Sequence, residues 1–307
     1  MPRQSSEEPA KQVVIRDSAS IKWGNGLITG QWSLTVQELR LLFALSSQIE
    51  PGQERFELSE APISELGAMM GLSQGNMYSV INNAALSLGD KRLFFRLGDT
   101  WVKSPWFSII GYDDSRSVLC WRFNDDIAAA LLNLKSAYVR YAAKPLMGFK
   151  SIYAGRWFLL ALQYERLGAI DLSVDDVRKL FELGSKYAAF KDFYRNVVAA
   201  PVKEINEFSD LHIDVTPIKT KRQYTRLEVR IGRKQGAGDG KQAPVDFIDA
   251  PARQIRFFEN AGARRAEAQD DSAESPADGA SPLSEGARAL MERMAAQGKR
   301  IKDIVRK

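Results

Sequence analysis

The sequence predicts an α+β protein built from two tandem domains, in each of which a helix-turn-helix precedes a β-hairpin. Three observations carry this prediction. Apolar residues recur at helical spacing over 34–49, 62–70, 74–88, 149–167, 171–183 and 186–206. Apolar and polar residues alternate, as in half-buried strands, over 91–96, 101–112, 116–123, 211–219 and 224–231. The order of helices and strands repeats once, and this order is the plan of a winged helix.

Composition and charge fit a globular protein with an acidic partner. Of the 307 residues, 45% are hydrophobic, and Lys plus Arg outnumber Asp plus Glu by 43 to 38. The surplus is local, since residues 144–234 hold 17 Lys and Arg against 11 Asp and Glu. The single cysteine, Cys120, allows no intrachain disulfide, and no apolar run reaches the ~18 residues of a membrane span. We therefore expect a cytoplasmic protein that does not enter a membrane.

Changes in sequence character divide the chain into four parts. Residues 1–30 are polar and then rich in glycine, and we expect them to form a mobile N-terminal arm. A first winged helix is expected over 31–143 and a second over 144–234. Residues 235–307 contain a Gly-rich linker and an Ala/Glu/Asp/Ser/Pro tract that cannot bury enough apolar area to fold. We expect this last part to be a disordered C-terminal tail that carries short interaction motifs.

The first helix-turn-helix is predicted at 62–88, with its turn at Gly71-Leu72. The exposed face of its second helix offers hydrogen-bonding groups without charge, at Asn76, Tyr78 and Asn82. The nearest cations, Lys91 and Arg92, follow the helix. These residues are candidates for DNA contact, and we expect weak binding because few of them can neutralise phosphates.

The strongest local signal is the helix predicted at 186–206. One face is expected to enter a core and carries Phe190, Phe193, Tyr194, Val197, Val198 and Ile205. The opposite face and its flank can read base edges or grip phosphates and carry Lys186, Lys191, Asp192, Arg195 and Asn196. The alternative for Arg195 is an ion pair with Asp192 or Glu204. Ser185 is the expected N-cap, and Pro201, which lacks an N–H, should kink the helix or loosen one turn.

The second hairpin is basic around its turn. Positive side chains gather there at Lys219, Lys221, Arg222 and Arg226. A cluster of this kind neutralises the phosphate backbone without reading sequence. We therefore expect the second domain to supply most of the affinity for double-stranded DNA.

The segment YAAFKDFYRNVVAAPVKEINEFSDLHIDV, over 187–215, resembles the C-terminal domain of the iteron-binding Rep family of plasmid replication initiators. The resemblance rests on Tyr187, Phe190-Lys191-Asp192-Phe193, Arg195, Val197-Val198, Pro201, Lys203-Glu204-Ile205-Asn206 and Ser209-Asp210-Leu211. It extends from about Leu34 to about Ile231 and leaves both ends of the chain outside it.

This resemblance implies two winged-helix domains that bind tandem DNA repeats at a plasmid origin. It implies that the first domain contributes to both DNA contact and dimerisation, with monomers binding the repeats and a homodimer repressing the initiator's own gene. It also implies the recruitment of host replication proteins, with the sliding clamp and the replicative helicase as candidates. The alternative function is a winged-helix transcriptional repressor without initiator activity.

Enzyme chemistry is not expected. The sequence contains no phosphate-binding Gly-rich loop of the Walker type and no G-x-S-x-G motif. Its one histidine, His212, lies on the polar face of a predicted strand beside Asp214 and is most simply a surface residue. One histidine and one cysteine cannot form a structural zinc site. We expect neither a cofactor nor a metal.

Two features of the tail stand out. Gln254, Ile255, Phe257 and Phe258 resemble the short peptide by which bacterial proteins dock on the sliding clamp of DNA polymerase. The alternative is that the two phenylalanines fold back onto the second winged helix. Residues 283–297 form an apolar helical stripe whose role the pattern does not indicate.

Overall fold

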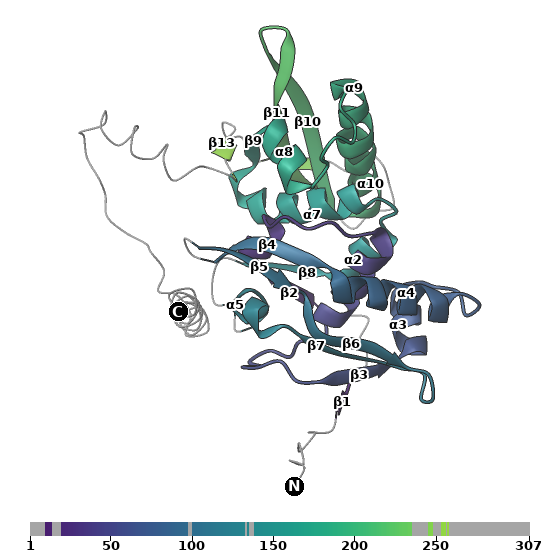
Figure 1. The fold of residues 1–307 in the computed structure, drawn as a ribbon. Coiled ribbons are helices and arrows are strands. Elements are labelled where there is room, and N and C mark those ends of the chain that lie inside the picture. Colours follow the sequence, from purple (N-terminus) through teal and green to yellow (C-terminus); the bar gives the residue numbers. More distant parts are fainter. Residues whose placement is uncertain are drawn as a thin grey trace, which may run out of the picture.

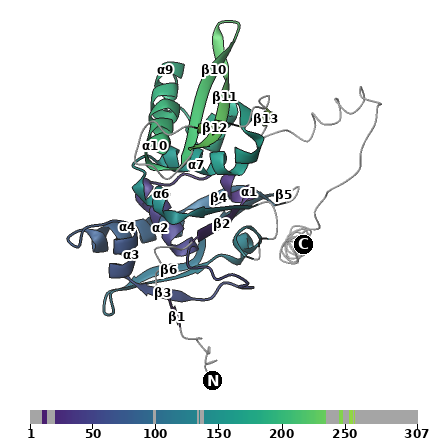
Figure 2. The ribbon, with the colours of Figure 1, turned by 180° about the vertical axis from the view of Figure 1, so that it is seen from behind.

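The computed structural model describes residues 10–13, 20–97, 100–132, 134, 138–234, 245–247, 253–255 and 257. These residues form two stacked units of helices and strands (Figure 1), seen from behind in Figure 2. The hairpin of β10 (Leu211–Thr220) and β11 (Gln223–Lys234) projects from the second unit, on the side away from the first. No helix within the described ranges is long and apolar enough to cross a membrane.

The first unit is a winged helix, as predicted. Its main elements are α2 (Val36–Ser46), β3 (Ser59–Pro62), α3 (Ile63–Met69), α4 (Met77–Asp90), β6 (Phe107–Asp113) and β7 (Val118–Phe123). The strands pair antiparallel in the order β3-β7-β6, so β6 and β7 form the wing. A capping box starts α2, because Thr35 Oγ1 accepts from Glu38 N at 3.2 Å and Glu38 Oε2 accepts from Thr35 N at 2.7 Å.

The second unit repeats this plan, and the predicted fold class is thereby confirmed. Its helices are α7 (Ile152–Tyr164), the 3-10 turn η2 (Glu165–Leu167), α8 (Val174–Leu180), and a continuous helix of α9 (Phe190–Phe193), η3 (Tyr194–Ala199) and α10 (Ala200–Phe208). The strands β9 (Ala169–Ser173), β11 and β10 pair antiparallel in that order. Ser173 is the predicted cap of α8, and its Oγ accepts from Asp176 N at 2.9 Å.

Short strands extend both sheets at corresponding edges. In the first unit β1 (Lys11–Gln12) pairs parallel with β3, and in the second β13 (Arg253–Ile255) pairs parallel with β9. A further strand, β12 (Val245–Phe247), pairs antiparallel with the end of β11. Segments that flank the two winged helices in sequence therefore complete their sheets.

The expectation of a mobile arm over 1–30 is wrong for residues 20–30. Here β2 (Ser20–Gly24) pairs antiparallel with β8 (Tyr138–Ala142), and α1 (Asn25–Ile28) follows directly. Trp23 is fully buried among the rings of Trp32, Phe43 and Trp106. The apolar side chains of this Gly-rich stretch outweigh its flexibility, because their burial stabilises an ordered strand and helix.

An additional hairpin separates α4, the second helix of the first helix-turn-helix and hereafter the first recognition helix, from the wing of β6 and β7. β4 (Arg92–Leu97) and β5 (Thr100–Pro105) form a two-stranded sheet of their own. The alternating pattern predicted a strand over 91–96, a turn at 97–99 and returning strands over 101–112, and the pairing of β4 with β5 agrees with this order. The expectation that 116–123 would pair with these strands holds for β6. After the wing come the 3-10 turn η1 (Asp125–Ile127), α5 (Ala128–Leu131), β8 and α6 (Ala143–Gly148), which lead into the second unit.

Helix α7 joins the two units through one continuous hydrophobic core. An added Cβ at Gly155 would lie 2.6 Å from Leu39 Cδ2 on α2, so glycine allows these helices to approach closely. Arg40 on α2 donates from Nη2 to Phe149 O at 2.9 Å, just before α7. Glu204 on α10 accepts from the backbone N–H groups of Lys150 and Ser151 at the same place. Both units therefore contact the start of α7.

The predicted loosening at Pro201 is confirmed. The helix widens into the π-helical turn η3 immediately before α10. In a regular α-helix the carbonyl of Val197 would accept from the N–H of residue 201, which proline lacks. Trp157 on α7 supplies the missing donor, since its Nε1 donates to Val197 O at 2.7 Å in the buried core.

Candidate nucleic-acid interface

One arginine holds the turn of the second helix-turn-helix. Arg178 on α8 donates from Nη1 to Tyr187 O at 2.9 Å, and from Nη2 to Lys186 O at 2.7 Å and Gly184 O at 3.2 Å. The backbone of this turn enters the left-handed region at Glu182, Gly184 and Tyr187, with φ of 50°, 53° and 54°. Hydrogen bonds to a charged donor offset the cost of that conformation. Sequence periodicity gave no signal for this role of Arg178.

The continuous helix of α9, η3 and α10, hereafter the second recognition helix, starts later than predicted. Its first residue is Phe190, preceded by Ala189, so Ser185 lies in the turn and does not cap the helix. Lys186, predicted on the helix flank, is exposed in this turn. The difference arises because Arg178 and the left-handed residues extend the turn, and neither feature affects apolar periodicity.

The outer face of the recognition helix keeps the predicted charges at the surface. Lys191 and Arg195 are exposed, and Arg195 Nη2 lies 3.0 Å from Asp192 Oδ1. The alternative ion pair therefore exists, although both side chains remain accessible, at 66% and 48% exposure. Asn196 is used locally, since its Nδ2 donates to Asp192 O at 2.8 Å. Arg195 and Lys191 are thus better placed than Asn196 to reach a partner.

The second wing presents cations at its tip. Lys221 and Arg222 form the two-residue connection between β10 and β11, and both are exposed, as is Lys219. Lys221 has a φ of 59°. We call Lys191, Arg195, Lys219, Lys221 and Arg222 together the basic surface. Arg226, the fourth predicted wing cation, pairs instead with Asp171 on β9 at 2.5 Å, nearer the base of the hairpin.

Stacked rings fix the wing to the recognition helix. Phe190 at the start of the helix stacks on Tyr224 of β11, with ring centroids 4.3 Å apart and planes 15° apart. Tyr194 Oη donates to Val215 O on β10 at 2.9 Å. Lys219 Nζ lies 4.6 Å from the ring centroid of Tyr224. Phe190 and Tyr194, both predicted to enter the core, are half-buried and hold the two parts of the basic surface together.

Two family models match the chain, one for each winged helix, and the first extends through most of α7, the helix that joins the two units. The model described as Initiator Replication protein, WH1, covers residues 20–162, and the model described as Initiator Rep protein, WH2, covers residues 173–231. The chain belongs to the Rep family of replication initiators. A Replication initiation protein of Escherichia coli is 23% identical to this Rep chain over 204 residues, which are 62% of the chain and 63% of that protein. The chain therefore spans less than two thirds of this relative's length.

A solved structure of an initiator protein has the same fold. The Pi initiator protein, crystallised in complex with iteron DNA, superposes with a TM-score of 0.60 at 16% identity. The match covers 72% of this chain and 100% of that chain. At this identity the likeness shows the fold alone, and that fold contains the two winged helices predicted from the sequence.

The first recognition helix of this Rep chain does not bring its predicted contact residues together. Asn76 and Tyr78 are exposed at the start of α4, while Asn82 is half-buried. Lys91 and Arg92 follow the other end of α4, about 20 Å away at 1.5 Å per residue. Lys91 Nζ also lies 3.9 Å from Glu38 Oε2, whose carboxylate is buried. Lys91 therefore compensates a buried charge within the first unit.

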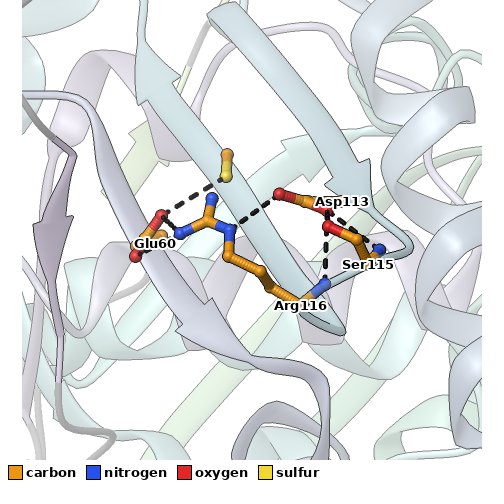
Figure 3. A network of polar contacts seen from close by, with 5 residues as sticks. Glu60, Asp113, Ser115 and Arg116 are labelled. Carbon is orange, nitrogen blue, oxygen red and sulfur yellow. Dashed lines mark hydrogen bonds and ion pairs between the residues drawn. The ribbon is translucent and has the colours of Figure 1, made fainter.

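The first wing is acidic at its turn, because Asp113 and Asp114 outnumber its one arginine, Arg116, which is itself bound by carboxylates (Figure 3). Arg116 Nε donates to Asp113 Oδ2 at 2.7 Å, and Nη1 donates to Glu60 Oε1 at 3.0 Å. Ser115 Oγ donates to Asp113 Oδ1 at 2.6 Å. The bonds from Ser115 and Arg116 lower the pKa of Asp113 to about 2. The two wings therefore differ in charge, and the second is the better phosphate ligand.

The tail motif of this Rep chain lies on the second unit. Gln254 pairs with Asp171 in the parallel register of β13 and β9, and its side chain is exposed. Ile255 and Phe257 are half-buried and pack against the core. For Phe257, this is the arrangement of the folded-back alternative. Phe258 and the predicted helix 283–297 lie outside the described residues.

The described residues contain no group of three or more His, Cys, Asp or Glu side chains that could hold a metal ion. His212 Nε2 lies 3.4 Å from Asp214 Oδ1 on the polar side of β10, as the strand pattern predicted.

Proposed function

We propose that this chain is a plasmid replication initiator that binds tandem repeats of double-stranded DNA at an origin through its two winged helices. The observation that carries the proposal is the basic surface, in which the cations of the recognition helix and of the wing are exposed on elements held together by the Phe190–Tyr224 stack. Such a surface can place a helix against base edges and a hairpin against phosphates. The Pi initiator, which has this fold, is bound to iteron DNA in its crystal structure. In this proposal the chain acts by binding, without a reaction or a cofactor.

Footprinting on the DNA that flanks the chain's own gene tests the proposal. We expect protection of tandem direct repeats, with each repeat spanning about two helical turns because each winged helix occupies about one. Failure to protect any repeated element would overturn the initiator assignment. Protection of a single inverted repeat over a promoter, with no direct repeats bound, would favour the transcriptional repressor instead.

A homodimer that represses the initiator's own gene is part of the proposal. It rests on the resemblance to the Rep family, in which monomers bind repeats and dimers repress. The acidic wing turn and the uncharged recognition face of the first unit support a domain that is not committed to DNA contact alone. The same footprinting experiment, repeated at rising protein concentration, should add protection over the promoter as the dimer forms.

Arg195→Ala should weaken binding to the specific site by about 1–3 kcal/mol and relax the preference at one base position. The reason is that arginine can donate two hydrogen bonds to guanine, and Arg195 is exposed on the recognition helix. Binding to a set of sites randomised one base pair at a time measures both effects. Unchanged affinity and preference would show that Arg195 serves only its ion pair with Asp192. Asn196→Ala, which removes a locally bonded amide, provides a matched substitution one position away and should change the preference less.

Recruitment of host replication proteins, among them the sliding clamp and the replicative helicase, completes the proposal. The clamp assignment rests on the tail motif, in which Gln254 is exposed and can form hydrogen bonds. Ile255 and Phe257 are only half-buried, and β13 is three residues long. The free energy needed to lift such a short strand from β9 is small compared with that of a core strand.

A peptide spanning residues 250–261 should bind purified sliding clamp, and the full chain should bind more weakly than the peptide. The difference arises because Ile255 and Phe257 must leave β9 before they can enter an apolar pocket. Calorimetry with peptide, full chain and a Phe257→Ala, Phe258→Ala double variant measures this order. The double variant should lose clamp binding and keep origin binding. Absence of binding by both peptide and full chain would end the clamp assignment.

A further inference from the structure

Arg156 lies at the boundary between the two winged helices, with its guanidinium buried. It belongs to α7 and is 3% exposed. Its Nη2 donates to two backbone carbonyls from opposite sides of the boundary, at 2.9 Å to Gly30 O and at 2.5 Å to Leu180 O. Gly30 follows α1 in the first unit, and Leu180 ends α8 in the second helix-turn-helix. One atom thus ties the two units together.

Aromatic rings from both units lie against the same guanidinium. Its central carbon is 3.8 Å from the ring centroid of Trp32 in the first unit and 5.2 Å from that of Phe181 in the second. Trp32 is itself fixed, because its Nε1 donates to Leu27 O at 3.0 Å. A planar cation that lies against ring faces resists rotation as well as translation. The contact therefore restricts the orientation of one unit relative to the other.

Stabilisation of the fold does not by itself explain why residue 156 is an arginine. Burial lowers the pKa of Arg156 to about 9, so the side chain stays charged at neutral pH. Its Nε and Nη1 are buried with no hydrogen-bond partner among the described residues. An apolar side chain of similar length could fill the space without the cost of removing a charge from water. What the arginine adds is a pair of directional bonds.

The other contacts at the boundary do not restrict the relative orientation of the two units in the same way. Much of the boundary is apolar core, whose attraction is non-directional and does not by itself specify one hydrogen-bonded orientation. Arg40 and Glu204 bond to backbone at the start of α7, about two turns from Arg156. Phe181 lies in the turn that Arg178 bonds, next to the second recognition helix. A small rotation at Arg156 would therefore change where that helix meets DNA relative to the first.

We infer that Arg156 sets the separation between the two DNA half-sites that the paired winged helices accept. The inference rests on the proposed DNA-binding function. Because B-DNA turns once in about 10–10.5 base pairs, adding one base pair between the half-sites rotates one of them by roughly 35° about the axis. Two domains held in one relative orientation should lose affinity when the spacing changes. Two loosely coupled domains should lose little affinity.

The test compares binding to full sites whose half-sites are separated by the natural spacing or by one or two added or deleted base pairs. The unchanged protein should lose about tenfold or more in affinity when the spacing changes, comparable to a mismatched base pair. Arg156→Met and Arg156→Lys should lose less than about threefold, because neither can bond both carbonyls while stacked on Trp32, and weakly coupled domains behave as joined by a flexible linker. Their affinity for each half-site alone should stay unchanged. Equal spacing preference in the variants and in the unchanged protein would overturn the inference.

A matched control separates orientation from general loss of stability. Phe56→Leu replaces a buried ring that packs on Phe123, away from the boundary between the two units. This variant should keep the full spacing preference at a loss of thermal stability comparable to that of Arg156→Met. If Arg156→Met folds too poorly to assay, Arg156→Lys, which retains the charge, serves alone.

A distance measurement tests the same inference without DNA. Spin labels on cysteines placed at the exposed positions Ser64 and Glu207, in a Cys120→Ser background, report the separation of the two units. The distance distribution should be narrow with Arg156 and broader in both variants. An equally narrow distribution in the variants would overturn the inference even if the chain bound no DNA, and a failure to find a DNA site would leave this measurement intact. The two failures are therefore distinguishable.

Discussion

Trp157→Phe should lower the free energy of unfolding by about 2–4 kcal/mol, of which about 1–3 kcal/mol comes from an unsatisfied buried carbonyl and the rest from lost volume. The carbonyl is that of Val197, whose regular helical donor is absent because residue 201 is proline. Phenylalanine fills most of the space of the indole but has no N–H. Chemical denaturation of the full chain, followed by circular dichroism, measures the loss.

Trp106→Phe is the matched control for this substitution. Trp106 is also fully buried, but its Nε1 has no hydrogen-bond partner among the described residues. Loss of its N–H therefore removes no bond, and we expect a smaller loss of stability than at Trp157. Similar losses at the two tryptophans would contradict the role assigned to the Val197 bond.

A double-mutant cycle with Pro201→Ala sharpens the test. Alanine restores an N–H at residue 201, which can bond to Val197 O once the indole is absent. The double variant should therefore be more stable than the sum of the single losses predicts, by about 1 kcal/mol. Strict additivity would show that tryptophan and proline do not share this carbonyl.

Removal of the two cations at the tip of the second wing should have the largest effect on DNA affinity. Lys221→Gly together with Arg222→Ala should reduce the slope of log affinity against log salt by about 1.8, since each lost phosphate contact changes it by about 0.9. Specific and random DNA should be weakened alike, because these contacts carry no base information. Glycine is chosen at residue 221 because the backbone there has a φ of 59°, so the hairpin is retained while the charge is lost.

Lys11→Ala provides a control for the loss of positive charge away from the wing. Lys11 lies on β1 at the far end of the molecule from the wing tip (Figure 1) and pairs with Glu50 at 3.1 Å. Its loss removes one positive charge, half of what the wing variant removes, and should leave the salt slope unchanged. A loss of affinity by the wing variant that is confined to the specific sequence would contradict phosphate contact by the wing.

The fold was largely predictable because it depends on local periodicity that the sequence repeats. The helices of both units fall where apolar residues recur, and Ser173 caps α8 as its position indicates. Pro201 loosens the helix where its missing N–H requires it. The N-terminal strand was not predicted, because Trp23 gains its burial from Phe43 and Trp106, which lie far along the chain. The glycines near Trp23 instead favoured the prediction of a mobile arm.

The charged residues of the candidate site were predictable. Whether each of them is bound by a partner within the chain was less predictable. Lys191, Arg195, Lys221 and Arg222 are exposed where the pattern placed them. Pairing partners cannot be derived from periodicity when they come from another element. Arg226 is bound to Asp171, which lies 55 residues earlier in the chain. For the same reason, periodicity could not predict that Phe190 would stack on Tyr224 and join the helix to the wing.

The short parallel strands at the sheet edges also bear on self-association in the test tube. Without β13, the outer edge of β9 would present unpaired N–H and C=O groups beside an apolar surface, a combination that invites pairing with another chain. β1 covers the corresponding edge of β3 in the first unit. A shortened chain that stops at residue 234 should therefore precipitate more readily than the full chain, even though both winged helices are complete. Light scattering during slow heating would show the difference.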